Sequence, residues 1–303
     1  MDRPRRIAVL DAPSNLGLRP PTAHTVPGCA KAPGALRDRQ LVKRLNAVDA
    51  GCLTPPRYDP SHWRPGDGVD QAAEIAQYTR SLADRVERIW RVRDFPMVLG
   101  GDCSVLLGPL LAQKRRASKD DSRRGLIFVD GNSDFRHPGN SEFVGAAAAE
   151  ELALATGRGQ PDLTDINGMR PYVENDAVTL LGIRPDDPYR IELEASGIPS
   201  RTAPQVRADG TRRSADWARN AIGNVTSYWL HVDVDVLDPS VMPAVDGPMN
   251  GGLTLGELGH LISALIADAR CVGMDLTVFD PDYDPEGKYA KDIVDTLVAA
   301  FDQ

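Results

Sequence analysis

Residues 229–239 read WLHVDVDVLDP, a run of apolar and β-branched residues that two carboxylates interrupt and a proline ends. This composition predicts a buried strand that runs into a turn. His231, Asp233 and Asp235 are spaced by two residues, so in a strand they project from one face near its carboxyl end, where open α/β sheets bind ligands. Carboxylates are rarely buried unless they are paired or bound to a cation. The stretch therefore favours a metal site over the alternative, in which its polar residues only cap the turn near Asp238.

Two further apolar segments end in the same way. Residues 96–99 (PMVL) run into GGDCS at 100–104, and residues 125–129 (GLIFV) run into DGNSDF at 130–135. Taken singly, each has an ordinary explanation, because Asp, Gly, Asn and Ser are common turn residues and cysteine is a small buried side chain. Three such strand ends in one chain instead indicate one shared site. A phosphate-binding loop is not expected, since the glycines form neither GxGxxG nor GK[ST].

The composition favours a single α/β domain over residues 1–303. Strand-like segments alternate with amphipathic helical stretches such as 70–93 and 291–301, and the alanine-rich stretch 146–154 also predicts a helix; we find no linker, repeat or low-complexity tail. The net charge of −8, from 35 basic and 43 acidic residues, argues against a nucleic-acid partner. The four cysteines form no CxxC pair and no apolar run is long enough to span a membrane. We therefore expect reduced thiols, a cytoplasmic location and no membrane partner.

The motifs together resemble those of a known family. GGDCS, VDGNSDF, HVDVDVLDP, GGLT at 251–254 and PGCAKAPGALR near the N-terminus occur in the order and spacing of the arginase, agmatinase and formiminoglutamase (ureohydrolase) family, and the resemblance covers nearly the whole chain. The family's stretches GGDH, DAHxD and SxDxDxxDP hold a two-manganese cluster. The resemblance implies a three-layer α/β/α fold with a mainly parallel sheet and a metal-bridging hydroxide that attacks a guanidine or amidine carbon. It also implies a small-molecule substrate and a homo-oligomer, either a trimer or a hexamer.

Carried over by position, the family's metal ligands are only partly present. Asp130, Asp134, Asp233 and Asp235 match four of them, whereas Cys103 and Asn132 stand where the family has histidines. A thiolate suits zinc or iron better than manganese, and an amide oxygen is a weak neutral ligand. We therefore predict one or two divalent ions, manganese or a replacement for it, held by a weakened set of ligands: Cys103, Asp130, Asn132, Asp134, Asp233 and Asp235.

The substrate-binding positions also differ from the family pattern. Val278 stands where the family usually places the glutamate that grips the guanidinium, and residues 141–145 lack the proton-relaying histidine of arginases. A cation in a dry pocket needs an opposite charge to offset its desolvation. We therefore expect a less basic amidine, imine, hydroxyguanidine or amide instead of arginine, agmatine or guanidinobutyrate. If the strand that contains Val278 continues to Asp280, both side chains lie on the same face, and we expect Asp280 to replace the missing glutamate.

Further roles can be assigned to residues near these motifs. Asp134 is expected to orient the nucleophile and take its proton, and His137 or His231 to help the leaving amine. Arg136 and Asn140 are expected to bind a substrate carboxylate. Each histidine also has a plainer interpretation, His137 as an exposed loop residue and His231 as a hydrogen-bonded core residue.

Three functions remain open at this point. The first is a metal-dependent hydrolase acting on a non-peptide carbon–nitrogen bond. The second is a metal-free thiol enzyme in which Cys103 attacks an amidine carbon. The third is a pseudoenzyme that keeps the fold as a binding module. The first is favoured, because the four retained carboxylates would repel one another in an empty site.

Overall fold

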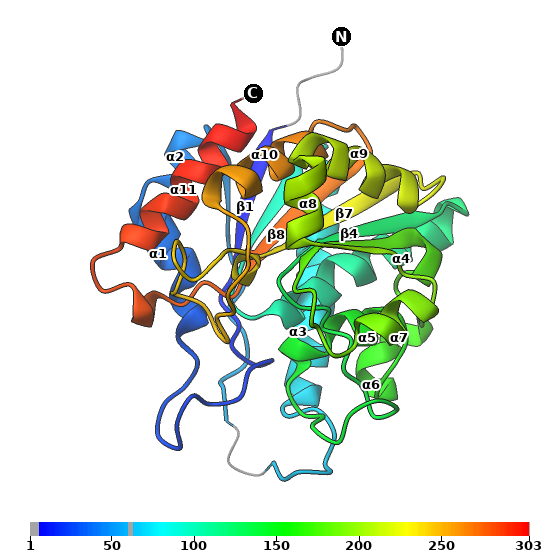
Figure 1. Cartoon of the computed structure of the whole chain (residues 1–303). Coiled ribbons are helices and arrows are strands. Elements are labelled where there is room, and N and C mark those ends of the chain that lie inside the picture. The colour runs from blue at the N-terminus through cyan, green and yellow to red at the C-terminus, as the bar shows by residue number, and fades with distance from the viewer. Residues whose placement is uncertain (1–5, 60–62, 303) are drawn as a thin grey trace.

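A single parallel sheet forms the centre of the molecule (Figure 1). The computed structural model describes residues 6–59 and 63–302. Within these ranges eight strands are arranged in the order β2-β1-β3-β8-β7-β4-β5-β6, and each neighbouring pair is parallel. The strands are β1 Ile7–Ala12, β2 Val48–Cys52, β3 Phe95–Gly100, β4 Arg124–Val129, β5 Val178–Ile183, β6 Ser200–Thr202, β7 Ser227–Asp233 and β8 Cys271–Thr277.

Helices cover both faces of the sheet. On one face α10 packs against α9 and α11, and α11 also contacts α1 and α2; on the other face α3 packs against α4 (Figure 1). The helices are α1 Ala32–Asp38, α2 Leu41–Arg44, α3 Ala72–Arg91, α4 Leu107–Asp120, α5 Glu151–Ala155, α6 Pro161–Thr164, α7 Arg190–Ala195, α8 Ala203–Asp209, α9 Thr211–Ala221, α10 Leu255–Ile266 and α11 Lys288–Phe301. The predicted three-layer α/β/α fold is confirmed.

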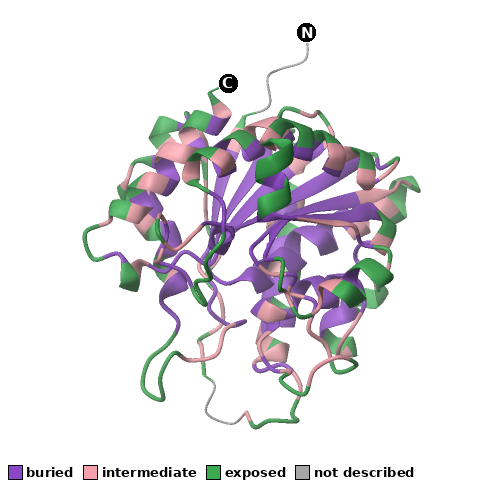
Figure 2. Ribbon diagram, in the orientation of Figure 1, coloured by how far each residue is buried: buried purple, intermediate pink, exposed green. Residues whose placement is uncertain are grey.

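The covering helices explain the composition of the central strands. Every residue of β3 (FPMVLG), β5 (VTLLGI) and β7 (SYWLHVD) is buried, and the sheet forms the buried interior of Figure 2. A sheet covered on both faces gives continuous apolar strands instead of alternating ones. The helices are amphipathic in turn, as in α3, where Ile75, Leu82 and Val86 face inward. No helix in the described ranges is both long and apolar enough to cross a bilayer.

The strand order brings the predicted motifs together. The last two strands, β7 and β8, are inserted between β3 and β4, so β3-β8-β7-β4 form the centre of the sheet. Parallel strands end at the same edge, and the motifs at 100–104, 130–135 and 233–235 follow β3, β4 and β7. Segments more than a hundred residues apart in the chain therefore meet at one edge, where α/β sheets bind ligands.

Two elements differ from the sequence-based predictions. β7 ends at Asp233, and residues 234–236 form a 3₁₀ turn, because Oδ1 of Asp233 accepts the backbone N–H of Asp235 at 2.6 Å. Asp235 was predicted to lie on the same strand face as His231, but it lies in the turn that follows the strand. The helix predicted over 146–154 is a 3₁₀ turn at Ala147–Ala149 followed by α5, which begins at Glu151.

Candidate metal centre

Cys103 follows β3 and faces Asp233 at the end of β7. Its Sγ lies 2.6 Å from Oδ2 of Asp233, to which the thiol donates, and Oγ1 of Thr277 lies 3.4 Å from the same oxygen. The neighbouring Asp102 is turned away, because its carboxylate accepts the Ser104 backbone N–H and the Ser14 hydroxyl. Burial, followed by the charge of Asp233, raises the pKa of the Cys103 thiol. Without a nearby cation, Cys103 is therefore a protonated thiol that donates to Asp233.

Asp130 and Asp235 are tied together by the turn after β4. Oδ1 of Asp130 accepts the backbone N–H of Asn132 at 2.6 Å, and Oδ1 of Asp235 accepts that of Gly131 at 3.0 Å. The side-chain amide of Asn132 donates to Oδ2 of Asp235 at 2.6 Å. Asn132, predicted as a ligand through its carbonyl oxygen, thus orients the carboxylate of Asp235 through its amide nitrogen.

His231 is fully buried in the sheet beneath these carboxylates. Its Nδ1 lies 2.5 Å from Oδ2 of Asp275, the residue opposite it on β8, and the indole N–H of Trp229 donates to Oδ1 of the same carboxylate. Because Asp275 accepts on both oxygens, Nδ1 carries a proton and Nε2 is left with a lone pair. Nε2 has no hydrogen-bond partner among the described residues; it lies 3.8 Å from Oδ2 of Asp130.

Glu151, the first residue of α5, brings a further carboxyl group into the site. Its side chain is fully buried and lies beside the carboxyl group of Asp134. Burial raises the pKa of Glu151, with the charge of Asp134 adding to the effect, and it raises the pKa of Asp134 to about 7. In the absence of a cation the two carboxyl groups are therefore expected to share a proton.

The ligand atoms of these residues form overlapping groups small enough to hold a cation. In each group one ligand atom per residue lies within 4.8 Å of the others; the groups are Cys103–His231–Asp233, Cys103–Asp134–Glu151, Asp130–Glu151–His231 and Asp130–Asp233–Asp235. Burial, with neighbouring carboxylates as the next cause, raises the pKa values of Asp130 and Asp233 as well. Buried carboxylates that repel one another, beside a lone pair without a partner, fit a divalent cation.

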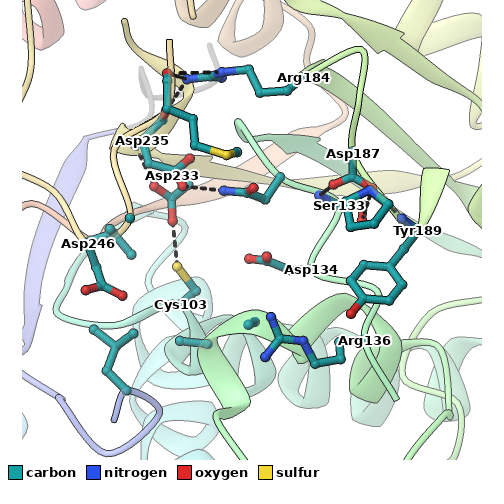
Figure 3. Close-up of a pocket in the computed structure, with 18 of the residues that line it drawn as sticks. Cys103, Ser133, Asp134, Arg136, Arg184, Asp187, Tyr189, Asp233, Asp235 and Asp246 are labelled. Atoms are coloured by element: carbon teal, nitrogen blue, oxygen red, sulfur yellow. Dashed lines mark hydrogen bonds between the residues drawn. The ribbon is translucent and has the colours of Figure 1, made fainter. Parts of the chain in front are cut away.

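A cavity of about 360 Å³ opens above this cluster (Figure 3). Cys103, Asp134 and Asp233 gather around the same space, and Arg136 and Tyr189 lie on its far side. The residues that line this cavity include Cys103, Asn132, Asp134, Arg136, Arg184, Asp187, Tyr189, Asp233, Asp235, Asp246 and Val278.

Arg184 fixes one part of the cavity wall. The buried guanidinium of Arg184 donates to the backbone carbonyls of Asp235 at 2.9 Å and Met249 at 2.7 Å, so it fixes residues 235–249 against the site.

Val278, another residue of the wall, has a strained backbone. Its φ is +71°, a left-handed conformation that β-branched residues rarely adopt. Such strain is typical of functional sites, where the surrounding structure over-determines the backbone.

Several predicted substrate residues are engaged elsewhere. His137 contacts Oε1 of Glu192 through Nε2 at 2.9 Å and accepts the backbone N–H of Gly139, while Asn140 donates to Oε2 of Glu192. Asp280 lies beyond the end of β8 and accepts backbone N–H groups of Gly28 and Asp282. None of His137, Asn140 or Asp280 lines the cavity just described. Their placement gives the predicted substrate roles no support, whereas Arg136 does line the cavity.

This geometry can be compared with known proteins. The model of the arginase family matches residues 5–301. The chain belongs to the arginase family. The arginase of Bacillus caldovelox is 27% identical over 303 residues, which cover 97% of either chain, and the arginase of Agrobacterium fabrum is 28% identical over 91% of this chain and 86% of its own. The native structure of the Bacillus caldovelox arginase superposes with a TM-score of 0.87 at 25% identity over 99% of both chains.

The fold extends to other members of the family. The structure of proclavaminate amidino hydrolase from Streptomyces clavuligerus has a TM-score of 0.70 at 20% identity, over 99% of this chain and 93% of that one, which shows a shared fold alone. As an arginase-family protein, the chain is a hydrolase of the class that acts on carbon–nitrogen bonds other than peptide bonds.

The family motifs did not lead to two residues of the cluster. Glu151 lies in the alanine-rich stretch AAAAEELALA, which was interpreted only as a helix; two adjacent glutamates in an apolar run were the available signal. Asp275 lies in the buried strand segment VGMDLTV, where a carboxylate needs a partner for the same reason as in β7. His231 was predicted as a catalytic group, but it is buried below the cavity and is not among the residues that line it.

Proposed function

We propose that this arginase-family protein is a metal-dependent hydrolase that cleaves a carbon–nitrogen bond of a small amidine, hydroxyguanidine or related compound. The observation that carries the proposal is the convergence of Asp130, Asp233 and Asp235, of which Asp233 and Asp235 line a cavity large enough for a small substrate. A divalent ion bound there supplies a water that is nucleophilic at neutral pH and polarises the substrate. Manganese, in one or two ions, is the metal that the family resemblance suggests.

Within the cavity Asp134 is placed to move the proton. Its carboxyl group lines the cavity beside the buried carboxyl group of Glu151, where it can accept a proton from the attacking water and return it to the leaving amine. Its backbone has a φ of +42°, so the turn after β4 fixes where the side chain points.

The cavity wall argues against a fully charged guanidinium as the preferred substrate. Val278 presents an apolar side chain to the cavity, at the position where the family pattern has a carboxylate. The similar proteins from Bacillus and Agrobacterium are named arginases, yet the side chain of Val278 offers a guanidinium no negative charge, and that charge would have to come from another carboxylate of the lining, such as Asp246. Arg136, which also lines the cavity, can bind a substrate carboxylate.

A thiol mechanism is less well supported. Cys103 is 1% exposed, and burial beside the charge of Asp233 raises the pKa of its thiol, which disfavours the nucleophilic thiolate. We propose in addition that the protein is cytoplasmic and a homo-oligomer, a trimer or a hexamer, with no nucleic-acid or membrane partner.

The experiment is a hydrolysis screen with a matched inactive variant. Urea and ammonia release would be measured for linear amidines, hydroxyguanidines and arginine, in protein loaded separately with manganese, zinc, cobalt and iron(II). We expect turnover of a substrate other than arginine, lost in Asp233→Asn, which keeps the shape of the side chain. Arginine as the best substrate would refute the substrate assignment. No turnover of any compound by fully loaded protein would favour the pseudoenzyme.

A further inference from the structure

We propose that His231 and Glu151 are metal ligands of this chain and replace the two histidines that are absent at positions 103 and 132. Together with Cys103, these ligands would make the metal centre select zinc, iron(II) or cobalt over manganese. The inference rests on the proposed function and specifies which residues hold the ion. It differs from the ligand set predicted from the sequence, which contains no imidazole nitrogen.

The first observation is a set of buried polar atoms that lack partners and lie together. Oδ2 of Asp130 and Nε2 of His231 have no hydrogen-bond partner within the described residues, and the oxygens of Glu151 have no side-chain neighbour to pair with except the carboxyl group of Asp134. The same three residues form one of the groups whose ligand atoms lie within 4.8 Å of one another. A buried acceptor without a donor is costly, and more so when it is charged. Acceptors from three residues at one point therefore indicate a cation that binds all of them.

The second observation is that the fold presents Nε2 of His231 as a ligand. The carboxylate of Asp275 accepts the N–H of His231 Nδ1 and also the indole N–H of Trp229. The ring of Phe128 on β4 stacks on the imidazole, with the ring centroids 4.4 Å apart. A metal-binding histidine usually donates its other ring N–H to a carboxylate or carbonyl, which fixes the tautomer. A core histidine without a metal would be expected to pair both nitrogens, whereas here only one is paired.

The third observation concerns Glu151 and its neighbour. Glu150 is equally buried, but it accepts the backbone N–H groups of Gly145 at 2.7 Å and Ala146 at 3.0 Å, so its charge is compensated by the loop before α5. Glu151 accepts no N–H group of that loop and faces Asp134, Asp130 and His231. The two adjacent glutamates thus differ in function, and Glu150 provides a matched control.

The ligand chemistry determines which ion is favoured. A thiolate and an imidazole suit zinc, iron(II) and cobalt, whereas carboxylates alone suit manganese. Cys103 and His231 share a group with Asp233, so a sulfur, a nitrogen and an oxygen are available to one ion. The group of Asp130, Asp233 and Asp235 is all oxygen and could hold a second, harder ion.

The test measures metal, not activity. Full-length protein would be stripped with a chelator, dialysed against an equimolar mixture of zinc, cobalt and manganese, and analysed for metal per chain, beside Glu151→Gln, His231→Gln and the control Glu150→Gln. We expect wild type and Glu150→Gln to take up zinc or cobalt in preference to manganese. Glu151→Gln and His231→Gln should bind these ions roughly tenfold or more weakly. Cobalt-loaded wild type should show a thiolate-to-cobalt charge-transfer band that Cys103→Ser lacks.

The possible outcomes separate this inference from the proposed function. If Glu151→Gln and His231→Gln keep all their metal while Asp233→Asn loses it, the inference is overturned and the hydrolase proposal stands. A preference of wild type for manganese, without a charge-transfer band, also overturns the inference. If wild type binds no ion, both proposals fail. Because His231→Gln leaves Asp275 without its partner, folding of every variant is checked by circular dichroism, and Glu151→Gln alone decides the case if His231→Gln does not fold.

Discussion

Asp275→Asn tests whether the carboxylate behind His231 positions a metal ligand. The substituted side chain has one oxygen and one NH₂ group in place of two acceptors, and the indole N–H of Trp229 needs the oxygen. The NH₂ group then faces Nδ1 of His231, so the ring proton moves to Nε2 and removes the lone pair that a metal requires. The substitution changes neither the cavity nor any residue that lines it.

The expected magnitude follows from the burial of this contact. Loss of a residue that orients a metal ligand typically weakens metal binding 10- to 100-fold, which is about 1.4 to 2.8 kcal/mol. We expect the upper half of this range, because the Asp275–His231 pair is completely buried and water cannot replace the carboxylate. Zinc affinity would be measured by competition with a chromophoric chelator.

A buried aspartate elsewhere provides the control. Asp284 is buried and accepts the backbone N–H of Ala290 at the start of α11, and it does not line the cavity. Asp284→Asn should leave zinc affinity unchanged within about twofold. If Asp275→Asn also binds zinc within about twofold of wild type, His231 is not a ligand that Asp275 orients, and the reasoning is refuted.

Three further predictions concern the stability and the selectivity of the site. Burial raises the pKa of Asp134 from 3.8 to about 7, so the stabilisation from its protonated form is complete below about pH 4 and is lost as the pH rises through about 7. The melting temperature of metal-stripped protein should therefore fall over this range, whereas that of metal-loaded protein should not. Parallel melting curves for the two forms would contradict this prediction. Arg184→Met, which leaves several backbone carbonyls without their donor, should lower the free energy of unfolding in urea by about 3 kcal/mol, and a loss below about 1 kcal/mol would show that the loop is held by other contacts. Val278→Glu, which returns a carboxylate to the cavity wall, should raise kcat/KM for arginine roughly tenfold; no gain, with metal content unchanged, would mean that this wall does not contact the guanidinium.

The fold could be predicted because its strands are buried on both faces. Continuous apolar segments such as PMVL and GLIFV, each followed by polar residues, indicated both the parallel sheet and the edge at which its ligands gather. Asp130 and Asp233 could be assigned to the site for the same reason, since each lies at or directly after the end of a central strand. Asp235 was placed on the strand because periodicity does not reveal where a local hydrogen bond ends it, here the one that Asp233 accepts.

The other parts of the site depend on contacts that the sequence does not encode locally. Glu151 reaches the cluster because the chain breaks into a 3₁₀ turn and a short helix, whereas helical periodicity predicted one continuous helix. The partner of His231 is Asp275, which is set by the register between β7 and β8 and not by spacing along the chain. His137 and Asn140 lie near the motif in sequence but bind Glu192 on α7, so closeness in the chain was a poor guide to the cavity.

The most direct test of the metal-hydrolase account is an anomalous difference map from crystals of the wild-type protein grown with zinc and manganese, recorded at the absorption edge of each metal. The account predicts a zinc peak at roughly 2.0–2.2 Å from both Nε2 of His231 and a carboxylate oxygen of Glu151, below the cavity that Asp134 lines. Absence of any ion would contradict the account as a whole. An ion bound by Asp233 and Asp235, with His231 and Glu151 unengaged, would contradict the rebuilt ligand set.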